Sequence, residues 1–188
     1  MARFEPLVKH FNRYLTIGGF PELALSDDDL YAQRMLREDV VDKVIKRDVL
    51  TLFKVRSPLL MEKLFLYLCM NSTEIFSATT AAKELDNISP NTIESYVDAL
   101  VKSNLIYMAY PIAVGSKSVL KGRPKIYIAD AAIRNAVLMV DDVLSDEREL
   151  GLLIETTVYK HLVSFYQGTG AQLGYYRKAK KIKKRSMP

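Results

Sequence analysis

The fold is decided between Ser57 and Asp130, where the chain runs PLLMEKLFLYLC (58–69), SATTAAKELD (77–86), SPNTIESYVDALVKSNL (89–105), IYMAYPI (106–112) and KIYIAD (125–130). The first three segments carry apolar residues at helical spacing, and the last two alternate as strands do. This order predicts three helices followed by two short strands, with a segment rich in Gly, Ser and Lys between the strands.

Local signals define the second and third of these helices. Ser77 is placed as an N-cap, and Ser89-Pro90 supplies a cap and a proline at the first helical position. Residues 86–88 form a tight turn between the two helices. The buried face of the third helix is predicted to consist of Ile93, Tyr96, Val97, Leu100 and Val101. The pattern predicts a helix-turn-helix with a two-stranded wing, which is a winged-helix domain over residues 57–130.

Two sets of polar residues in this region are candidates for contact with DNA. The opposite face of the third helix carries Asn91, Thr92, Ser95 and Lys102, and the wing carries Lys117, Lys121, Arg123 and Lys125. The same helix face also holds Glu94 and Asp98, which oppose DNA phosphates. We therefore expect a contact with the DNA backbone led by the wing, without sequence-specific recognition by the helix. The alternative is that the winged helix docks against protein.

The regions on either side are predicted to be helical as well. Residues 1–56 form a helical connector, in which an amphipathic helix ends at Gly18-Gly19 and a second helical segment starts after the capping residues 26–29. Residues 131–176 begin with a helix at Asp130 and continue as a long amphipathic helix. The predicted inward face of this long helix consists of Leu153, Thr157, Val158, Leu162 and Phe165. A strand is predicted at 173–176, so we interpret this region as the start of an incomplete α/β segment. The protein as a whole is predicted to be mainly α.

The net charge of +5 comes from the C-terminal end of the chain. Residues 177–188 contain seven basic residues and no acid, so the first 176 residues carry 20 basic and 22 acidic residues, a net charge of −2. A basic run of this kind usually forms a solvated end. A nucleic-acid-binding arm, a truncated strand and an appended segment are the alternatives for this basic tail.

Several classes of site are not expected. No apolar run approaches the length of a membrane span, charged residues interrupt the N-terminus where a signal peptide would lie, and we expect a cytoplasmic protein with no membrane partner. Neither His10 nor His161 has potential metal ligands at suitable spacing, and no catalytic constellation is visible. We predict no metal, no cofactor and no catalytic residue. The single cysteine, Cys69, is predicted to be a buried thiol.

Four segments occur together in an order typical of one known group of proteins. They are FNRYLTIGGFPE (11–22), IKRDVL (45–50), KIYIAD (125–130), and GLLIETTVYKHL (151–162) with a later YYRK (175–178). From Phe11 to about Arg177 the chain resembles the C-terminal half of a bacterial and archaeal group of AAA-type ATPases. The positions that carry the resemblance are Gly18, Gly19, Pro21, Glu22, Asp48, Tyr127, Asp130 and Glu155.

The resemblance implies neighbours that this chain does not contain. In that group a P-loop ATPase domain precedes the matching region, and a domain similar to restriction endonucleases follows, in which Glu155 would match a helix carboxylate. The chain has no GxxxxGK[ST] motif, and no Asp or Glu follows Glu155. A two-metal nuclease needs several converging carboxylates. We therefore expect neither nucleotide binding nor nuclease activity, and interpret the chain as a fragment or a stand-alone remnant.

These observations together suggest a function. We interpret the chain as an accessory region of an AAA-type ATPase that relays nucleotide state to a partner. The partner is double-stranded DNA, the ATPase domain or another protein. A stand-alone winged-helix DNA-binding regulator and an inactive nuclease-like scaffold are the alternatives.

Overall fold

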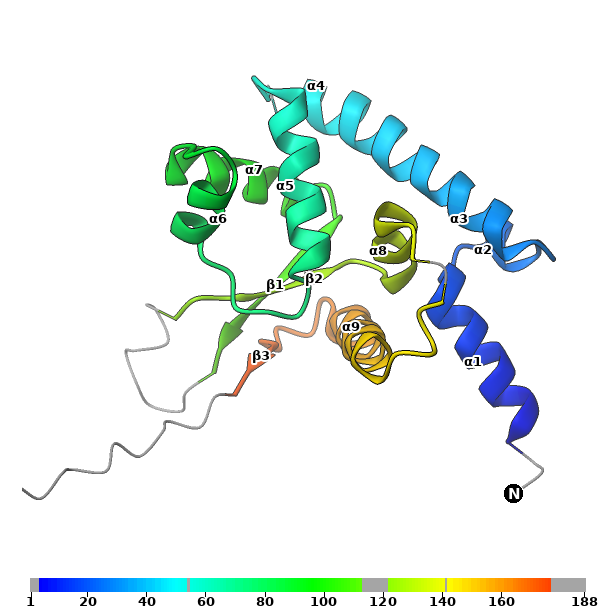
Figure 1. Ribbon diagram of the computed structural model, residues 1–188. Helices are drawn as coiled ribbons and strands as arrows, with labels where there is room; N and C mark the ends of the chain where they lie inside the picture. Colours follow the sequence, from blue (N-terminus) through cyan, green and yellow to red (C-terminus); the bar gives the residue numbers. More distant parts are fainter. Residues whose placement is uncertain (1–3, 54, 113–121, 141, 177–188) are drawn as a thin grey trace, which may run out of the picture.

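The computed structural model describes residues 4–53, 55–112, 122–140 and 142–176 and shows a mainly helical protein with a small three-stranded sheet (Figure 1). No helix within these ranges is long and apolar enough to cross a membrane. The elements are α1 (Glu5–Ile17), α2 (Pro21–Ala24), α3 (Asp29–Arg37), η1 (Glu38–Val49), α4 (Leu50–Leu52), α5 (Pro58–Met70), α6 (Ala78–Glu84), α7 (Pro90–Lys102), β1 (Ile106–Pro111), β2 (Lys125–Ile128), α8 (Ala131–Leu138), α9 (Glu147–Tyr166) and β3 (Gly174–Tyr175).

The N-terminal region is helical, as its sequence predicts. The α3, η1 and α4 segments follow one another without a break and form one long rod, whose middle part, η1, is wound as a π-helix (Figure 1). Asp28 caps the rod, since its carboxylate accepts a hydrogen bond from the Tyr31 N–H at 2.9 Å. The rod contributes Leu36, Ile45 and Val49 to the main core.

The main core lies around α5, which packs against η1, α7 and α8. Ser57 caps α5 by accepting a hydrogen bond from the Leu60 N–H, and Ser77 caps α6 by accepting one from the Thr80 N–H. Ser89 occupies the N-cap position of α7 but makes no side-chain capping bond, so Pro90 at the first helical position is the remaining start signal. Cys69 is fully buried, as predicted, and burial raises the pKa of its thiol.

The sheet has the strand order β2-β1-β3. The β1 and β2 strands are antiparallel, with Ile106 opposite Ile128 and Met108 opposite Ile126, and β3 is parallel to β1 on its other edge. The segment before α6 also reaches this sheet, because Ile75 forms an isolated antiparallel bridge with Lys125. The strand predicted at 173–176 therefore exists in part, and it extends the sheet that β1 and β2 begin.

The predicted inward face of α9 is wrong for three of its five residues. Leu153 and Thr157 are buried, but Val158, Leu162 and Phe165 are 52%, 40% and 77% exposed. The physical reason is that α9 is attached to the rest of the chain through polar and aromatic side chains on another face, so the helix is rotated away from the orientation that its apolar stripe favours. In α1 the apolar residues of the first two turns are exposed as well: Leu7, Val8 and Phe11.

Candidate functional site

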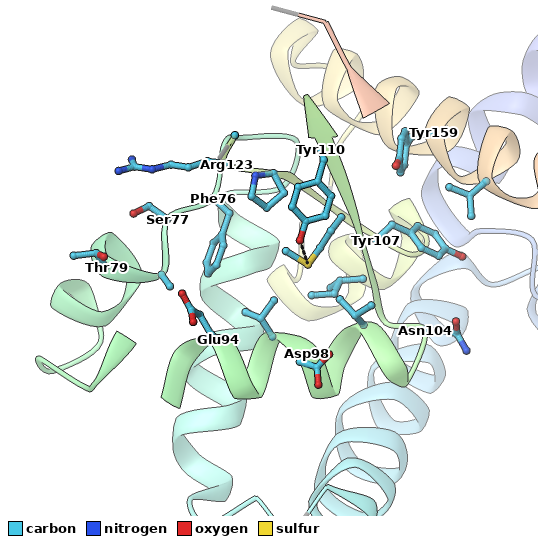
Figure 2. A pocket seen from close by; sticks show the side chains of 18 residues that line it. Phe76, Ser77, Thr79, Glu94, Asp98, Asn104, Tyr107, Tyr110, Arg123 and Tyr159 are labelled. Atoms are coloured by element: carbon cyan, nitrogen blue, oxygen red, sulfur yellow. Dashed lines mark hydrogen bonds between the residues drawn. The ribbon is translucent and has the colours of Figure 1, made fainter. Parts of the chain in front are cut away.

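A groove of about 840 Å³ lies along α7, between the start of α6 and the strand β1 (Figure 2). Its floor is apolar, with Val97 and Ile106 among the lining residues. Aromatic rings and two acids surround it, and the view shows Tyr110 above α7 with Phe76 to one side and Tyr107 to the other. The labelled lining residues are Phe76, Ser77, Thr79, Glu94, Asp98, Asn104, Tyr107, Tyr110, Arg123 and Tyr159.

The acids lie on this surface because of the helical periodicity of α7. Ile93, Val97 and Leu100 are turned into the core, which leaves Glu94 and Asp98 on the exposed side of the same helix. Asp98 forms an exposed ion pair with Lys102 at 2.6 Å. Glu94 has no hydrogen-bond or ion-pair partner among the residues that the structure describes. Glu94 therefore gives the groove one negative charge without a counterion in this part of the chain. The charge of Asp98 is only weakly compensated, because its ion pair with Lys102 is exposed to solvent.

The aromatic walls come from the segment before α6, the strand β1 and the helix α9. Tyr110 is half exposed, and its hydroxyl lies 4.0 Å from the sulfur of Met108, while Phe76 is half buried just before α6. Tyr107 and Tyr159 have ring centroids 6.4 Å apart, so α9 contributes to the far end of the groove. Aromatic faces next to carboxylates form a surface that suits cationic side chains.

The four helix positions predicted to meet DNA are separated by acids. Asn91, Ser95 and Lys102 are exposed on α7, but Thr92 is half buried. Glu94 and Asp98 lie on the same exposed face as Asn91, Ser95 and Lys102. Lys102 is engaged by Asp98. This face can donate and accept hydrogen bonds, but its charge does not favour a phosphate backbone.

The four predicted wing residues do not form one surface in the described part of the chain. Arg123 is exposed at the rim of the groove, whereas Lys125 turns toward α9 and pairs with Glu155 at 2.9 Å. Lys117 and Lys121 lie outside the described residues.

Tyr127 and Glu155, two of the positions that carry the sequence resemblance, meet where α9 is attached to the sheet. The Tyr127 hydroxyl donates a hydrogen bond of 2.8 Å to Glu155, which also receives the Lys125 ammonium. The ring of Tyr127 stacks on Tyr159 with centroids 4.1 Å apart and planes 13° from parallel. Burial raises the pKa of Tyr127, and the Glu155 carboxylate that accepts its hydrogen bond raises it further. Glu155 thus acts here as a structural acceptor that holds α9.

Asp130 forms a second attachment point for α9. One carboxylate oxygen caps α8 at the Ala132 N–H, 2.9 Å away, and the other forms an ion pair with Lys160. Burial lowers the pKa of Lys160, but Asp130 and the Tyr14 hydroxyl outweigh this and leave the pKa raised. The Tyr14 hydroxyl is 3.2 Å from the Lys160 ammonium and 3.1 Å from His161.

The glycines of the GGFPE segment make room for this attachment. Gly18 has φ +77°, and a Cβ there would lie 2.8 Å from the Asp130 Oδ1 and 2.9 Å from the Ala132 Cβ. A Cβ on Gly19 would lie 2.8 Å from the ring of Tyr14. Gly18 therefore allows the end of α1 to lie against the start of α8, and Gly19 leaves room for the ring of Tyr14.

The remaining positions that carry the sequence resemblance lie apart from both attachment points of α9. Pro21 and Glu22 are exposed in the first turn of α2, and Asp48 pairs with its neighbour Arg47 on η1 at 2.8 Å. No group of three or more His, Cys, Asp or Glu side chains among the described residues is placed to hold a metal ion.

Several residues that matter here were missed by the sequence analysis. Tyr107 and Tyr110 were treated only as strand residues, and Phe76 and Tyr159 were not considered at all. Tyr107 and Tyr110 in one predicted strand and Tyr127 in the other are a signal of aromatic clustering that could have been noticed. Lys160 and Tyr14 gave no signal, because they lie 146 residues apart in the chain.

The fold and the groove define a mainly helical protein with a small mixed sheet and an acidic, aromatic-walled surface groove. The chain belongs to a family described as a domain of unknown function (DUF8612), which matches residues 8–144. It is similar to two uncharacterized proteins of the archaeon Methanocaldococcus jannaschii. MJ1637 is 30% identical over 172 residues, which cover 90% of this chain and 35% of MJ1637. MJ1544 is 25% identical over 160 residues, which cover 83% of this chain and 34% of MJ1544.

The chain thus spans about a third of the length of these two relatives. No solved structure matches the chain significantly.

Proposed function

We propose that this chain is an accessory region of a larger AAA-type ATPase, in which a winged-helix unit docks a protein partner through the groove over α7. The order of α5, α6, α7, β1 and β2 supports the winged-helix assignment. The segment before α6 adds further support, because the Thr73 N–H bonds to the Ile126 carbonyl and the Phe76 N–H to the Pro124 carbonyl, as a short first strand of a winged helix would.

The ATPase part of the proposal is supported by the sequence resemblance and by length. The relatives are about three times as long as the matched segment, so a region of this kind sits in a larger protein in those two cases. The relay of nucleotide state would pass through contacts between this region and the remainder of such a protein. An inactive nuclease-like scaffold remains an alternative. It is consistent with Glu155, the one carboxylate that would match a nuclease, accepting hydrogen bonds from Tyr127 and Lys125.

The observation that carries the choice of partner is the unpaired Glu94 on the exposed face of α7, with Asp98 one turn further along. In a winged helix that enters the major groove, this face would have to approach phosphates, and two acids there oppose it. A protein surface with basic side chains meets no such opposition.

One observation favours a second candidate, which is backbone contact with DNA through the wing. Arg123 is exposed at the rim, two residues after the segment 113–121, whose sequence adds Lys117 and Lys121 without an acid. Contacts of this kind would be non-specific and strongly dependent on salt.

Fluorescence anisotropy with a labelled DNA duplex at two salt concentrations separates the two candidates. We would compare the parent chain with a wing variant (K117A, K121A and R123A) and with a tail variant in which the seven basic residues of 177–188 are changed to Gln. Lys125 is kept, because it holds Glu155. We expect DNA affinity to fall in the tail variant and to stay within about twofold in the wing variant. Loss of affinity and a shallower salt slope in the wing variant would overturn the docking proposal.

A further inference from the structure

The groove over α7 lies next to the C-terminal end of the described residues, because the lining residue Tyr110 pairs with Gly174. We infer that the basic tail, residues 177–188, binds in this groove and covers the exposed face of α7. The inference rests on the proposed docking role of the groove, and it names the kind of segment that the groove accepts, which is one rich in lysine and arginine.

Charge is the first reason. The tail contains seven basic residues and no acid, whereas the preceding 176 residues carry a net charge of −2. Within the described part of the chain Glu94 has no partner, and Asp98 is in an exposed pair in which a second cation can replace Lys102. Arg123 is the only basic residue among the described lining residues, and in Figure 2 it extends away on the far side of Phe76 from Glu94.

Position is the second reason. The last described strand, β3, lies beside the groove: the Ile112 N–H bonds to the Tyr175 carbonyl at 2.8 Å, and the Tyr175 hydroxyl donates to the Arg123 carbonyl at 2.8 Å. Arg123 and Tyr110 line the groove, and Tyr110 is paired with Gly174. The tail therefore starts one residue beyond Tyr176, next to the groove's rim.

Reach is the third reason. Twelve residues in an extended conformation span up to about 40 Å. The thirteen-residue helix α7 is about 20 Å long. A tail that starts at the rim can therefore run along the whole exposed face of α7.

The chemistry of the groove fits lysine and arginine side chains. Tyr110 and Phe76 offer ring faces to an ammonium or guanidinium group, and the Glu94 carboxylate lines the same groove. The apolar floor at Val97 and Ile106 accommodates the aliphatic stems of long basic side chains. The tail would then compete with any partner that docks on α7.

Paramagnetic relaxation in solution tests the inference on the full-length chain. Cys69 is fully buried, so Ser186→Cys supplies the reactive thiol for a nitroxide label at the end of the tail. We expect the amide signals of α7 and of residues 76–79 to broaden more than those of α3. We expect the effect to shrink at high salt, because at 1 M ionic strength charges are screened within about 3 Å.

Charge variants provide the decisive comparison. Glu94→Gln with Asp98→Asn removes the groove's acids and should lower the ratio of bound to free tail by about tenfold. Asp142→Asn with Glu147→Gln removes the same charge from an exposed segment elsewhere and should leave the broadening unchanged. The inference is overturned if α7 is broadened no more than α3, or if both pairs of substitutions have the same effect.

The outcome of the paramagnetic relaxation experiment is independent of the outcome of the DNA-binding experiment. Binding of DNA through the wing would overturn the proposed docking function, but broadening of α7 by the labelled tail would still stand. Conversely, a tail that stays away from α7 would leave the groove open to a separate protein partner.

Discussion

The helices α7 and α9 have the same kind of sequence pattern, but the apolar face is buried in α7 and largely exposed in α9. Both carry apolar residues at i, i+3 and i+4 spacing. In α7 the stripe is buried, with Ile93 and Leu100 fully inaccessible, whereas in α9 the stripe residues Leu162 and Phe165 are exposed. Periodicity therefore identifies the apolar face of a helix correctly in both cases, but it does not tell whether this chain supplies the surface that covers the face.

The difference lies in what holds each helix. The α7 helix is held by apolar packing against α5 and α6, which are its neighbours in the sequence. The α9 helix is held by two polar attachments, Glu155 to Tyr127 and Lys160 to Asp130, and these fix its rotation. Specific hydrogen bonds and ion pairs decide the orientation of α9, although its apolar residues favour another one.

Truncation of leucine in the two helices should give the largest contrast. Leu100→Ala removes a fully buried side chain from the core, so we expect the free energy of unfolding to fall by about 2–5 kcal/mol. Leu162→Ala removes a side chain that is 40% exposed and should change stability by less than about 1 kcal/mol. Urea unfolding followed by circular dichroism measures both values.

The comparison of the two leucines can fail in an informative way. Equal losses in both variants would mean that the face of α9 with Leu162 and Phe165 is covered in solution, for example by a second copy of the chain. Sedimentation of the Leu162→Ala chain beside the parent would then show a change in oligomeric state.

Two glycines with nearly the same backbone angle should differ in their tolerance of alanine. Gly18→Ala places a Cβ 2.8 Å from the Asp130 Oδ1 at φ +77°, so it combines backbone strain with damage to the cap of α8. We expect a loss of about 2–3 kcal/mol in the free energy of unfolding. Gly168, at φ +78°, has no atom within 4 Å of its Cβ position, and Gly168→Ala should cost only about 1 kcal/mol.

Gly168→Ala thus serves as the control for an alanine at positive φ. Gly18 also has ψ −170°, a combination almost confined to glycine, so part of any excess loss at Gly18 is backbone strain. If the two alanine variants lose the same stability in thermal unfolding, the contact between Gly18 and Asp130 does not help to hold α1 against α8. If Gly18→Ala is the more damaging, the GGFPE glycines owe their role to the attachment of α9 through Asp130.

Much of the fold could be predicted because its signals are local. The N-caps Asp28, Ser57 and Ser77, the turn at 86–88 and the apolar face of α7 all depend on residues within one or two helical turns of each other. The boundaries at residues 56, 130 and 176 stay predictions. The acidic face of the groove was visible for the same reason, since Glu94 and Asp98 follow from the register of α7.

What could not be predicted depends on contacts between distant residues. The stack of Tyr127 on Tyr159 and the hydrogen bond of Tyr14 to His161 join residues that are 32 and 147 positions apart, and no periodicity records such pairs. The pairing of β3 with β1 and the aromatic walls of the groove belong to the same category. The rotation of α9 was mispredicted because it follows from these contacts.

The hydrogen bond from Tyr127 to Glu155 should have a small effect on stability, and one that depends on pH. Tyr127→Phe removes the bond but leaves Glu155 paired with Lys125, so we expect a loss of about 1 kcal/mol at neutral pH. Burial and then Glu155 raise the pKa of Tyr127 in the folded chain above the usual value of about 10. The unfolded chain therefore releases this proton first as the pH rises.

The sign of the pH effect follows from that order of proton release. Below about pH 10 both states keep the phenol proton, and the contribution of Tyr127 to stability is complete. Above about pH 10 the unfolded state binds fewer protons than the folded state, so the free energy of unfolding falls as the pH rises. The Tyr127→Phe chain should lose stability less steeply above pH 10 than the parent in urea unfolding. Burial raises the pKa of Tyr159 too, so some decline should remain in the variant. Identical slopes would show that Tyr127 ionises as easily in the folded chain as in the unfolded one, and that α9 is held mainly by Lys160 and Asp130.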